Sequence, residues 1–135
     1  MVKNRPHAPV KNDTEEQLST ILHALRASRR RKVIHLLDDE KTDTTVSTRS
    51  LARKIAGREN GIPPEHMSGE PYKNVYNALS HSHLPTLMKA GIIVYDPQRQ
   101  HVEKGPSFHL AALLLKLNTP TVETFYRQFH RSGQS

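Results

Sequence analysis

Residues 71–104 decide the predicted fold, and they read PYKNVYNALSHSHLPTLMKAGIIVYDPQRQHVEK. The first part carries apolar residues at helical spacing, and Gly91 follows at a point where a helix often ends in a left-handed residue. After Gly91, a β-branched and aromatic run, a turn at 96–100 and a second short run predict a β-hairpin. The apolar positions that define the helical face are Val75, Leu79, Leu84, Leu87 and Met88.

A helix followed at once by a hairpin with a basic tip is the layout of a winged helix. The predicted fold class is therefore mainly α with a small β-hairpin, a winged helix-turn-helix with two extra C-terminal helices. We expect a flexible basic tail at 1–12, a winged-helix DNA-binding domain at 13–105, C-terminal helices at 106–131 and a disordered tail at 132–135.

Composition limits the function classes. The 135 residues suit one domain, and 20 Lys and Arg against 13 Asp and Glu give a net charge of +7, which favours a polyanionic partner. The absence of cysteine excludes disulfides and thiolate metal sites. The apolar run at 110–115 is too short to span a bilayer, and the polar first residues lack the apolar core of a signal peptide. We therefore expect a cytoplasmic protein without membrane contact.

Three helices are predicted before the quoted stretch. Asp13, with Glu16 three residues later, forms a capping box for a helix that ends near Ala27. A second helix runs from Ser28 to about Asp38. Its first turn carries four cations where the helix dipole favours anions, so they are interpreted either as phosphate contacts or as a solvated basic face.

The third helix has the position of the supporting helix of a helix-turn-helix. Residues 41–46 form a loop that could hold a short edge strand, Ser47 or Thr48 caps the helix, and Gly57 lies near its end. The connection at 58–70 is about a dozen residues, against three or four in a simple helix-turn-helix.

The polar face of the quoted helix is the candidate DNA-reading surface. Asparagine can bond adenine bidentately and lysine can bond guanine, whereas the alternative is an ordinary polar helix face. Pro85 predicts a kink or restart of this helix. The predicted recognition-helix residues are Lys73, Asn74, Asn77, Ser80 and His81.

Two further groups of residues are expected to contact the DNA backbone. Arg99, with Gln98 and Gln100 beside it, lies at the hairpin tip, where a wing contacts backbone or minor groove. The predicted wing residues are Gln98, Arg99 and His101. The predicted phosphate contacts are Arg29, Arg30, Arg31, Lys32 and Arg49.

Catalysis and metal binding are not predicted. His81 and His83 are two residues apart, which on a helix points their rings about 200° apart and prevents joint ligation. The sequence contains no phosphate-binding glycine loop, nucleophile elbow or HExxH motif. We expect no enzyme activity, no cofactor and no metal.

The C-terminal region predicts self-association. The segment from Phe108 to Leu117 is apolar on almost every face, which a domain of this size cannot cover alone. A further apolar helix is predicted from Val122 to Phe129. A two-fold homodimer through these two segments would bury them.

The stretches SRRRKVIHLL, VSTRSLARKIAGRE and PYKNVYNALSHSHLPTLMKAGIIVYD carry a family resemblance. Over about residues 16–102 the chain resembles an uncharacterised family of archaeal, mainly haloarchaeal, winged-helix DNA-binding proteins, and more distantly it is similar to PadR, MarR and ArsR regulators. The resemblance implies transcriptional control by a DNA-binding homodimer. Two departures are the basic rather than acidic composition and the long connection at 58–70.

The predicted function is therefore sequence-specific binding of double-stranded DNA by a nucleoid-associated regulator, most simply a homodimeric repressor. One alternative is a plasmid or virus replication or partition protein that binds DNA. The other is a protein-interaction module that keeps the fold without binding DNA.

Overall fold

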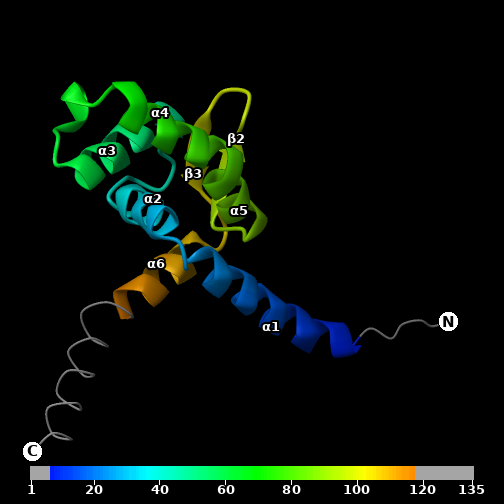
Figure 1. The fold of residues 1–135 in the computed structure, drawn as a ribbon. Helices are drawn as coiled ribbons and strands as arrows, with labels where there is room; N and C mark the ends of the chain where they lie inside the picture. Colours follow the sequence, from blue (N-terminus) through cyan, green and yellow to red (C-terminus); the bar gives the residue numbers. More distant parts are fainter. Residues whose placement is uncertain (1–6, 118–135) are drawn as a thin grey trace, which may run out of the picture.

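A computed structural model describes residues 7–117 of the chain (Figure 1). The described chain is mainly helical and contains one small antiparallel sheet. In chain order the elements are α1 (His7–Ala24), α2 (Ser28–Asp38), β1 (Val46–Ser47), α3 (Thr48–Asn60), the 3₁₀ turn η1 (Pro64–His66), α4 (Gly69–Ala78), the π turn η2 (Leu79–His83), α5 (Leu84–Lys89), β2 (Ile93–Asp96), β3 (His101–Lys104) and α6 (Phe108–Lys116).

The first helix differs from the prediction at both ends. It begins at His7 rather than at Asp13, and it ends at Ala24 rather than near Ala27. The residues from His7 onward in the predicted tail therefore belong to α1, and residues 1–6 lie outside the described chain. The predicted helix from Val122 to Phe129 and the tail at 132–135 also lie outside it.

The start of α3 confirms the predicted cap, and Gly57 lies near the end of the helix as predicted. The side-chain oxygen of Ser47 accepts a hydrogen bond from the backbone N–H of Ser50 at 3.0 Å. The helix continues past Gly57 to Asn60 and ends at Gly61, whose φ of 67° is in the left-handed region. Gly57 lies within the last four residues of the helix and is buried there, where the following connection passes close to its backbone.

The predicted break before Pro85 is present as a π turn. The backbone N–H of Leu84 donates to the carbonyl of Leu79, five residues earlier, so one extra residue is accommodated between α4 and α5. Proline has no N–H to continue the α-helical pattern, which gives this irregularity a local cause. The helix run then ends before Gly91, which has the expected positive φ of 76°.

The three strands form a sheet of order β1-β3-β2, and both pairs are antiparallel. In the predicted hairpin, Tyr95 pairs with Val102 and both side chains are buried. The edge strand expected in the threonine-rich loop is β1, in which Val46 also pairs with Val102. This pairing brings the start of α3 next to the hairpin.

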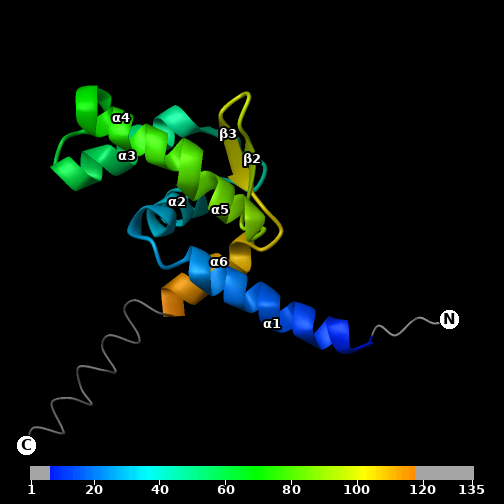
Figure 2. The ribbon, with the colours of Figure 1, turned by 45° about the vertical axis from the view of Figure 1, so that its right-hand side comes forward.

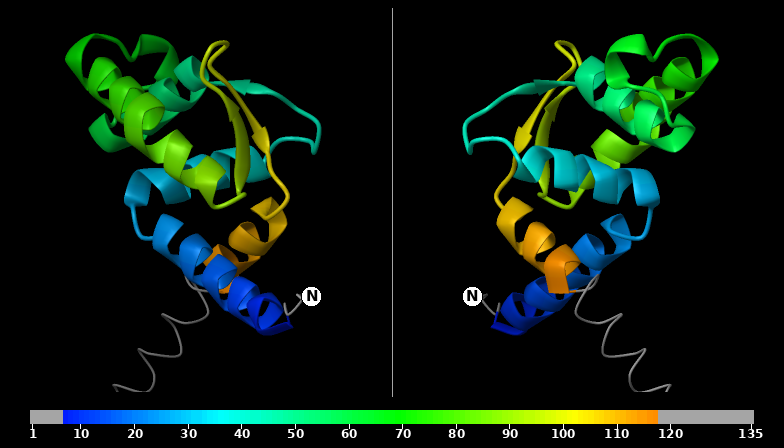
Figure 3. Two further views of the ribbon diagram at one scale, coloured as in Figure 1. Left: turned by 90° about the vertical axis from the view of Figure 1, so that its right-hand side faces the viewer. Right: turned by 90° about the vertical axis from the view of Figure 1, so that its left-hand side faces the viewer.

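The core lies between α2, α3, the α4–α5 run and the sheet, with α1 and α6 closing one end (Figures 2 and 3). Phe108 of α6 is fully buried in this core, as is Ile21 of α1. In all views α4 and the loop between β2 and β3 lie at the end of the molecule opposite to α1 and α6. Within the described residues, no helix has the length and apolar character needed to cross a membrane.

Replacing Gly57 with alanine tests the close packing behind α3. Helix propensity alone predicts stabilisation of up to about 1 kcal/mol. However, an added Cβ would lie 2.5 Å from the carbonyl oxygen of Ile62, so Gly57→Ala should instead lower the free energy of unfolding by about 1–3 kcal/mol. Denaturant unfolding measures the sign, and the exposed Arg58→Ala in the same helix is the control, expected within about 0.5 kcal/mol of the unsubstituted protein. Stabilisation by Gly57→Ala would contradict the packing.

Candidate nucleic-acid interface

The outward face of α4 is polar because its opposite face is buried. Val75 is 1% exposed, whereas Lys73, Asn74 and Asn77 are exposed to solvent. The three polar side chains make no hydrogen bond or ion pair with any other part of the described chain. Their donors and acceptors are therefore available to an external partner.

The remaining two predicted helix residues lie in the π turn and differ from each other. His81 is exposed. Ser80 is half-buried, and its hydroxyl donates to the side-chain oxygen of Gln100 at 3.2 Å. Ser80 is thus engaged within the protein, unlike the polar residues of α4.

The loop between β2 and β3 is built by Asp96. Its Oδ1 accepts hydrogen bonds from the backbone N–H groups of Gln98 at 3.0 Å and Arg99 at 3.2 Å. The Arg99 side chain is 78% exposed and its Nε lies 4.0 Å from Asp96 Oδ2, a separation at which an exposed pair contributes little. The loop stands beside the α4–α5 run (Figure 3), and its arginine side chain is exposed.

A hollow of about 300 Å³ lies between one predicted phosphate contact, Arg49, and two predicted wing residues, Arg99 and His101. It lies where the start of α3, α4 and the β2–β3 loop meet, and its lining contains two arginines from different elements, Arg49 and Arg99. The full lining is Ser47, Arg49, Tyr76, Arg99, Gln100 and His101. Two separated guanidinium groups around one hollow suit a phosphodiester oxygen better than an uncharged ligand.

The cluster from Arg29 to Lys32 has partners inside the protein. Arg29 donates two hydrogen bonds of 2.9 Å to the carboxylate of Glu59, and Lys32 Nζ lies 3.6 Å from the same group. Arg30 donates to the carbonyl of Ala24 at 2.7 Å, and Arg31 donates to the carbonyls of Leu25 at 2.8 Å and Arg26 at 2.7 Å.

These contacts explain why four cations occupy the first turn of α2. The last backbone carbonyls of α1 and those just after it accept no hydrogen bond from a following helical N–H. The C-terminal end of a helix also favours positive charge. The cations therefore satisfy the end of α1 while Glu59 of α3 balances them. The hydrogen bond from Arg29 lowers the pKa of Glu59, which keeps this carboxylate charged.

Three contributors to this surface were not selected from the sequence. Tyr76 lines the hollow, and Tyr72, beside it on α4, lies under the guanidinium of Arg53 at 5.7 Å from the ring centre. The helical spacing of Tyr72 and Tyr76 with Val75 was the only sequence signal for these tyrosines. That spacing is as typical of core packing as of a binding surface. Gln100 was placed at the hairpin tip, whereas its side chain bonds inward to the π turn.

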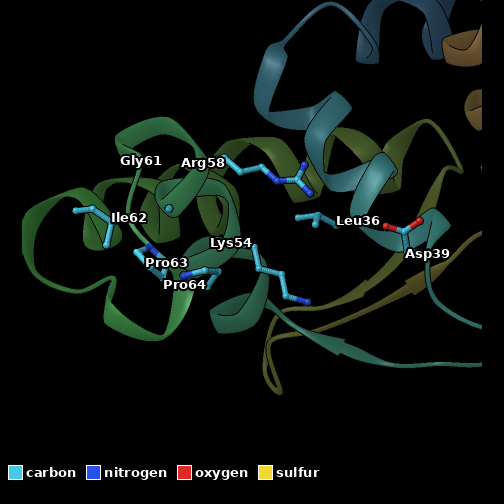
Figure 4. Close-up of a pocket in the computed structure, with 9 residues that line it drawn as sticks. Leu36, Asp39, Lys54, Arg58, Gly61, Ile62, Pro63 and Pro64 are labelled. Carbon is cyan, nitrogen blue, oxygen red and sulfur yellow. The ribbon is translucent and has the colours of Figure 1, made fainter.

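A second hollow, of about 570 Å³, lies behind α3 (Figure 4). The side chains of Lys54 and Arg58 extend along it from α3, with Leu36 and Asp39 on the α2 side. Asp39 is the single carboxylate among its lining residues, and that lining, all of it described, includes no histidine, serine or threonine.

The histidines of the π turn lie in different surroundings. His81 is exposed, whereas His83 is half-buried with Nδ1 3.4 Å from Arg30 Nη1. Burial, and then the positive charges of Arg30 and Arg29, lower the pKa of His83. From residue 7 to residue 117, no group of three potential metal-ligating side chains comes together.

The buried position of His83 predicts a pH-dependent contribution to stability. Its folded pKa is below the ordinary value of 6.5, so the unfolded chain takes up the proton first as the pH falls. The stability of the native protein relative to His83→Gln should be greatest above pH 6.5 and should decline as the pH falls through the lowered folded pKa. Urea unfolding of both proteins from pH 8 to 5 measures this difference. A constant difference over that range would contradict it, and added salt should weaken the dependence by screening the arginines.

Comparison with known proteins identifies the family. A family model described as "Domain of unknown function (DUF7344)" matches residues 22–103, which is more than half of the 135 residues. The matched part runs from the last turn of α1 into β3, so it contains the polar face of α4, the start of α3 and the β2–β3 loop. No curated protein and no solved structure matched the chain. The chain belongs to the family of proteins that carry the DUF7344 domain.

Proposed function

We propose that this protein binds double-stranded DNA in a sequence-specific manner as a homodimeric transcriptional regulator, most simply a repressor. In this proposal, α3 is the supporting helix of a winged helix-turn-helix, α4 is the recognition helix and the β2–β3 loop is the wing. The proposal extends the resemblance to archaeal winged-helix proteins that the sequence carries.

The order of the elements supports the winged helix-turn-helix assignment. From α2 to β3 the order is a helix, a short strand, the helix α3, the α4–α5 run and a hairpin. The short strand pairs with the second strand of the hairpin, so the wing and the start of α3 lie together. The connection between α3 and α4 is long for this motif, and the turn η1 occupies part of it.

The observation that carries the proposal is the exposed face of α4. Lys73, Asn74 and Asn77 are exposed on one helix, and none of their side chains makes a hydrogen bond or ion pair with the rest of the described chain. Asparagine and lysine are residue types that read adenine and guanine in the major groove, and a good bidentate pair contributes about 1–3 kcal/mol of discrimination. We assign Asn74 and Asn77 to base reading and Lys73 to a base or a phosphate.

The phosphate contacts are assigned chiefly to the residues around the small hollow. Arg49 and Arg99 line it from two sides, and the exposed Arg53 continues the positive surface along α3. The cluster from Arg29 to Lys32, also expected to bind phosphate, is largely engaged in internal contacts. We therefore give that cluster a secondary role in the proposed interface.

The homodimer is assigned to α1 and α6, at the end opposite to α4. Phe108, Ala111, Ala112 and Leu115 of α6 are buried in the core, so they are not available to a partner chain. The outer face of α6 still exposes leucines, and α1 exposes two more, and exposed apolar side chains of this kind are candidates for a protein contact. The exposed leucines are Leu18 and Leu22 on α1, Leu110 and Leu113 on α6, and Leu117 directly after α6.

Selection of bound sites from random DNA duplexes tests the main proposal. A regulator should enrich one motif with two-fold symmetry, because a dimer presents two copies of α4. Many iterated sites would favour the replication or partition function. Failure to retain any duplex at low salt would exclude DNA binding, and the exposed leucines would then favour the protein-interaction module.

Two alanine variants test the division between base and phosphate contacts. Asn77→Ala should relax the preference at one base step by about 1–3 kcal/mol, with little change in binding to unrelated DNA. Arg99→Ala should weaken binding to all duplexes and reduce the slope of log K against log salt by about 1. Lys89→Ala, which removes an exposed charge from the end of α5, is the control for net charge. Identical effects of the two variants would refute the assignment.

A charged substitution on α6 tests the homodimer. Leu113 is 52% exposed, so Leu113→Glu should leave the fold intact but place two like charges across a two-fold interface and convert the dimer to a monomer. Val94→Glu is the matched control, because Val94 is 49% exposed on β2 and lies outside the leucine surface. Light scattering measures the mass of both variants and of the original protein. A monomeric original protein would contradict the assignment directly.

A further inference from the structure

Gln100 connects three parts of the candidate interface. Its backbone carbonyl accepts a hydrogen bond from the N–H of Thr48, at the start of α3, at 2.9 Å. Its side-chain oxygen accepts from the hydroxyl of Ser80 at 3.2 Å, and its side-chain nitrogen donates to the carbonyl of Pro97 at 2.8 Å. One residue therefore joins the supporting helix, the π turn and the tip of the loop.

We infer that Gln100 is a positioning residue that holds the wing in its DNA-binding position before DNA arrives. This inference rests on the proposed function, because it concerns how the proposed wing reaches DNA. Gln100 adopts a φ of 56°, a left-handed conformation that a residue other than glycine adopts rarely. The three hydrogen bonds supply a reason for the protein to keep this conformation.

The π turn explains how Ser80 reaches Gln100. Its hydrogen bond from Leu84 to Leu79 accommodates an extra residue, which changes the direction in which the following side chains leave the helix. Ser80 bonds to the loop on one side, while His83 in the same turn contacts Arg30 of α2 on another. The turn thus secures the wing at one point and the body of the domain at another.

The bond also limits what Ser80 can contribute to recognition. A serine hydroxyl has one hydrogen to donate, and here that hydrogen is directed to Gln100. Ser80 can still accept a hydrogen bond, but it cannot donate to a phosphate or to a guanine acceptor without releasing the loop. We therefore assign Ser80 to positioning, together with Gln100, rather than to base reading.

Arg99 is the residue that benefits from this arrangement. Its side chain is 78% exposed and has only a 4.0 Å approach to Asp96, so its own contacts do little to locate it. Its position depends on the backbone, which is held by Asp96 on one side and by Gln100 on the other. A loop already ordered in the free protein does not have to lose conformational entropy when it binds.

Substitutions at Ser80 and Gln100 test the inference. Gln100→Gly removes both side-chain hydrogen bonds and suits the positive φ, so it adds no backbone strain, and Ser80→Ala removes one of these bonds without the backbone freedom that glycine adds. Ser80→Ala removes the hydroxyl, whereas Ser80→Thr retains it and should restore the behaviour of the original protein. The exposed Ser82→Ala in the same turn is the matched control.

Hydrogen exchange in the absence of DNA provides the first measurement. Gln100→Gly and Ser80→Ala should speed the exchange of the Thr48 amide and of the amides of residues 98–101 by about tenfold, whereas Ser80→Thr and Ser82→Ala should not. This result does not depend on the identity of the partner. Unchanged exchange in both variants would overturn the inference even if DNA binding were established.

A double-mutant cycle with Arg99 on duplex DNA provides the second measurement. If Gln100 acts by positioning Arg99, Gln100→Gly should weaken binding about tenfold alone but by less than about twofold when Arg99→Ala is already present. Ser80→Ala should behave in the same way. Additive losses would overturn the inference, because they would indicate that Ser80 and Gln100 contact DNA directly. Faster exchange without any DNA binding would instead reject the proposed function and keep the connection between wing and helix.

Discussion

The burial of one face of the run from α4 to α5 is the constraint on which the rest of this structure depends. Val75, Leu79, Leu84 and Leu87 are each at most 1% exposed, so the helix cannot rotate about its axis without moving apolar surface into water. Because the apolar face is held inward, the polar face of α4 is held outward. The same burial holds the π turn at a fixed distance from the sheet, where Ser80 meets the hairpin loop.

Charge in this protein serves internal structure as well as an external surface. Four successive cations at the start of α2 are unfavourable for that helix, but they lie at the end of α1 and beside Glu59 of α3. A net charge of +7 therefore overstates the charge that is free to meet a polyanion. The exposed cations Arg49, Arg53 and Arg99 lie on α3 and the hairpin loop, on a surface that continues onto α4.

Local sequence signals predicted most of the elements near the candidate site. The apolar spacing before Gly91, the β-branched run after it and the cap at Ser47 each act within a few residues, and the structure confirms all three. Gly57 was correctly placed near the end of α3, but the sequence did not show that its small size leaves room for the carbonyl oxygen of Ile62. The predicted start of α1 was wrong because the capping pair of Asp13 and Glu16 does not prevent the helix from beginning earlier, at His7.

Contacts between residues far apart in sequence could not be predicted in this way. Arg30 and His83 are separated by 53 positions in the sequence, and Ser80 and Gln100 are separated by 20. Both separations are longer than any local sequence motif. Whether a polar residue faces a neighbour or solvent depends on such pairs, which explains why Asn77 and Ser80 share a predicted face but differ in their engagement. The sequence also could not predict which leucines of α6 are exposed, because that depends on which side of α6 packs against α2.

The separation of the two ends of the molecule has a consequence for how such a protein can diversify. The polar helix face and the hairpin loop lie at one pole, and the exposed leucines of α1 and α6 lie at the other. In the proposed regulator, substitutions at the leucine pole would change the assembly state without altering a side chain proposed to read DNA, and the reverse would also hold. Selection could then adjust the stoichiometry and the sequence preference of such a regulator as independent traits.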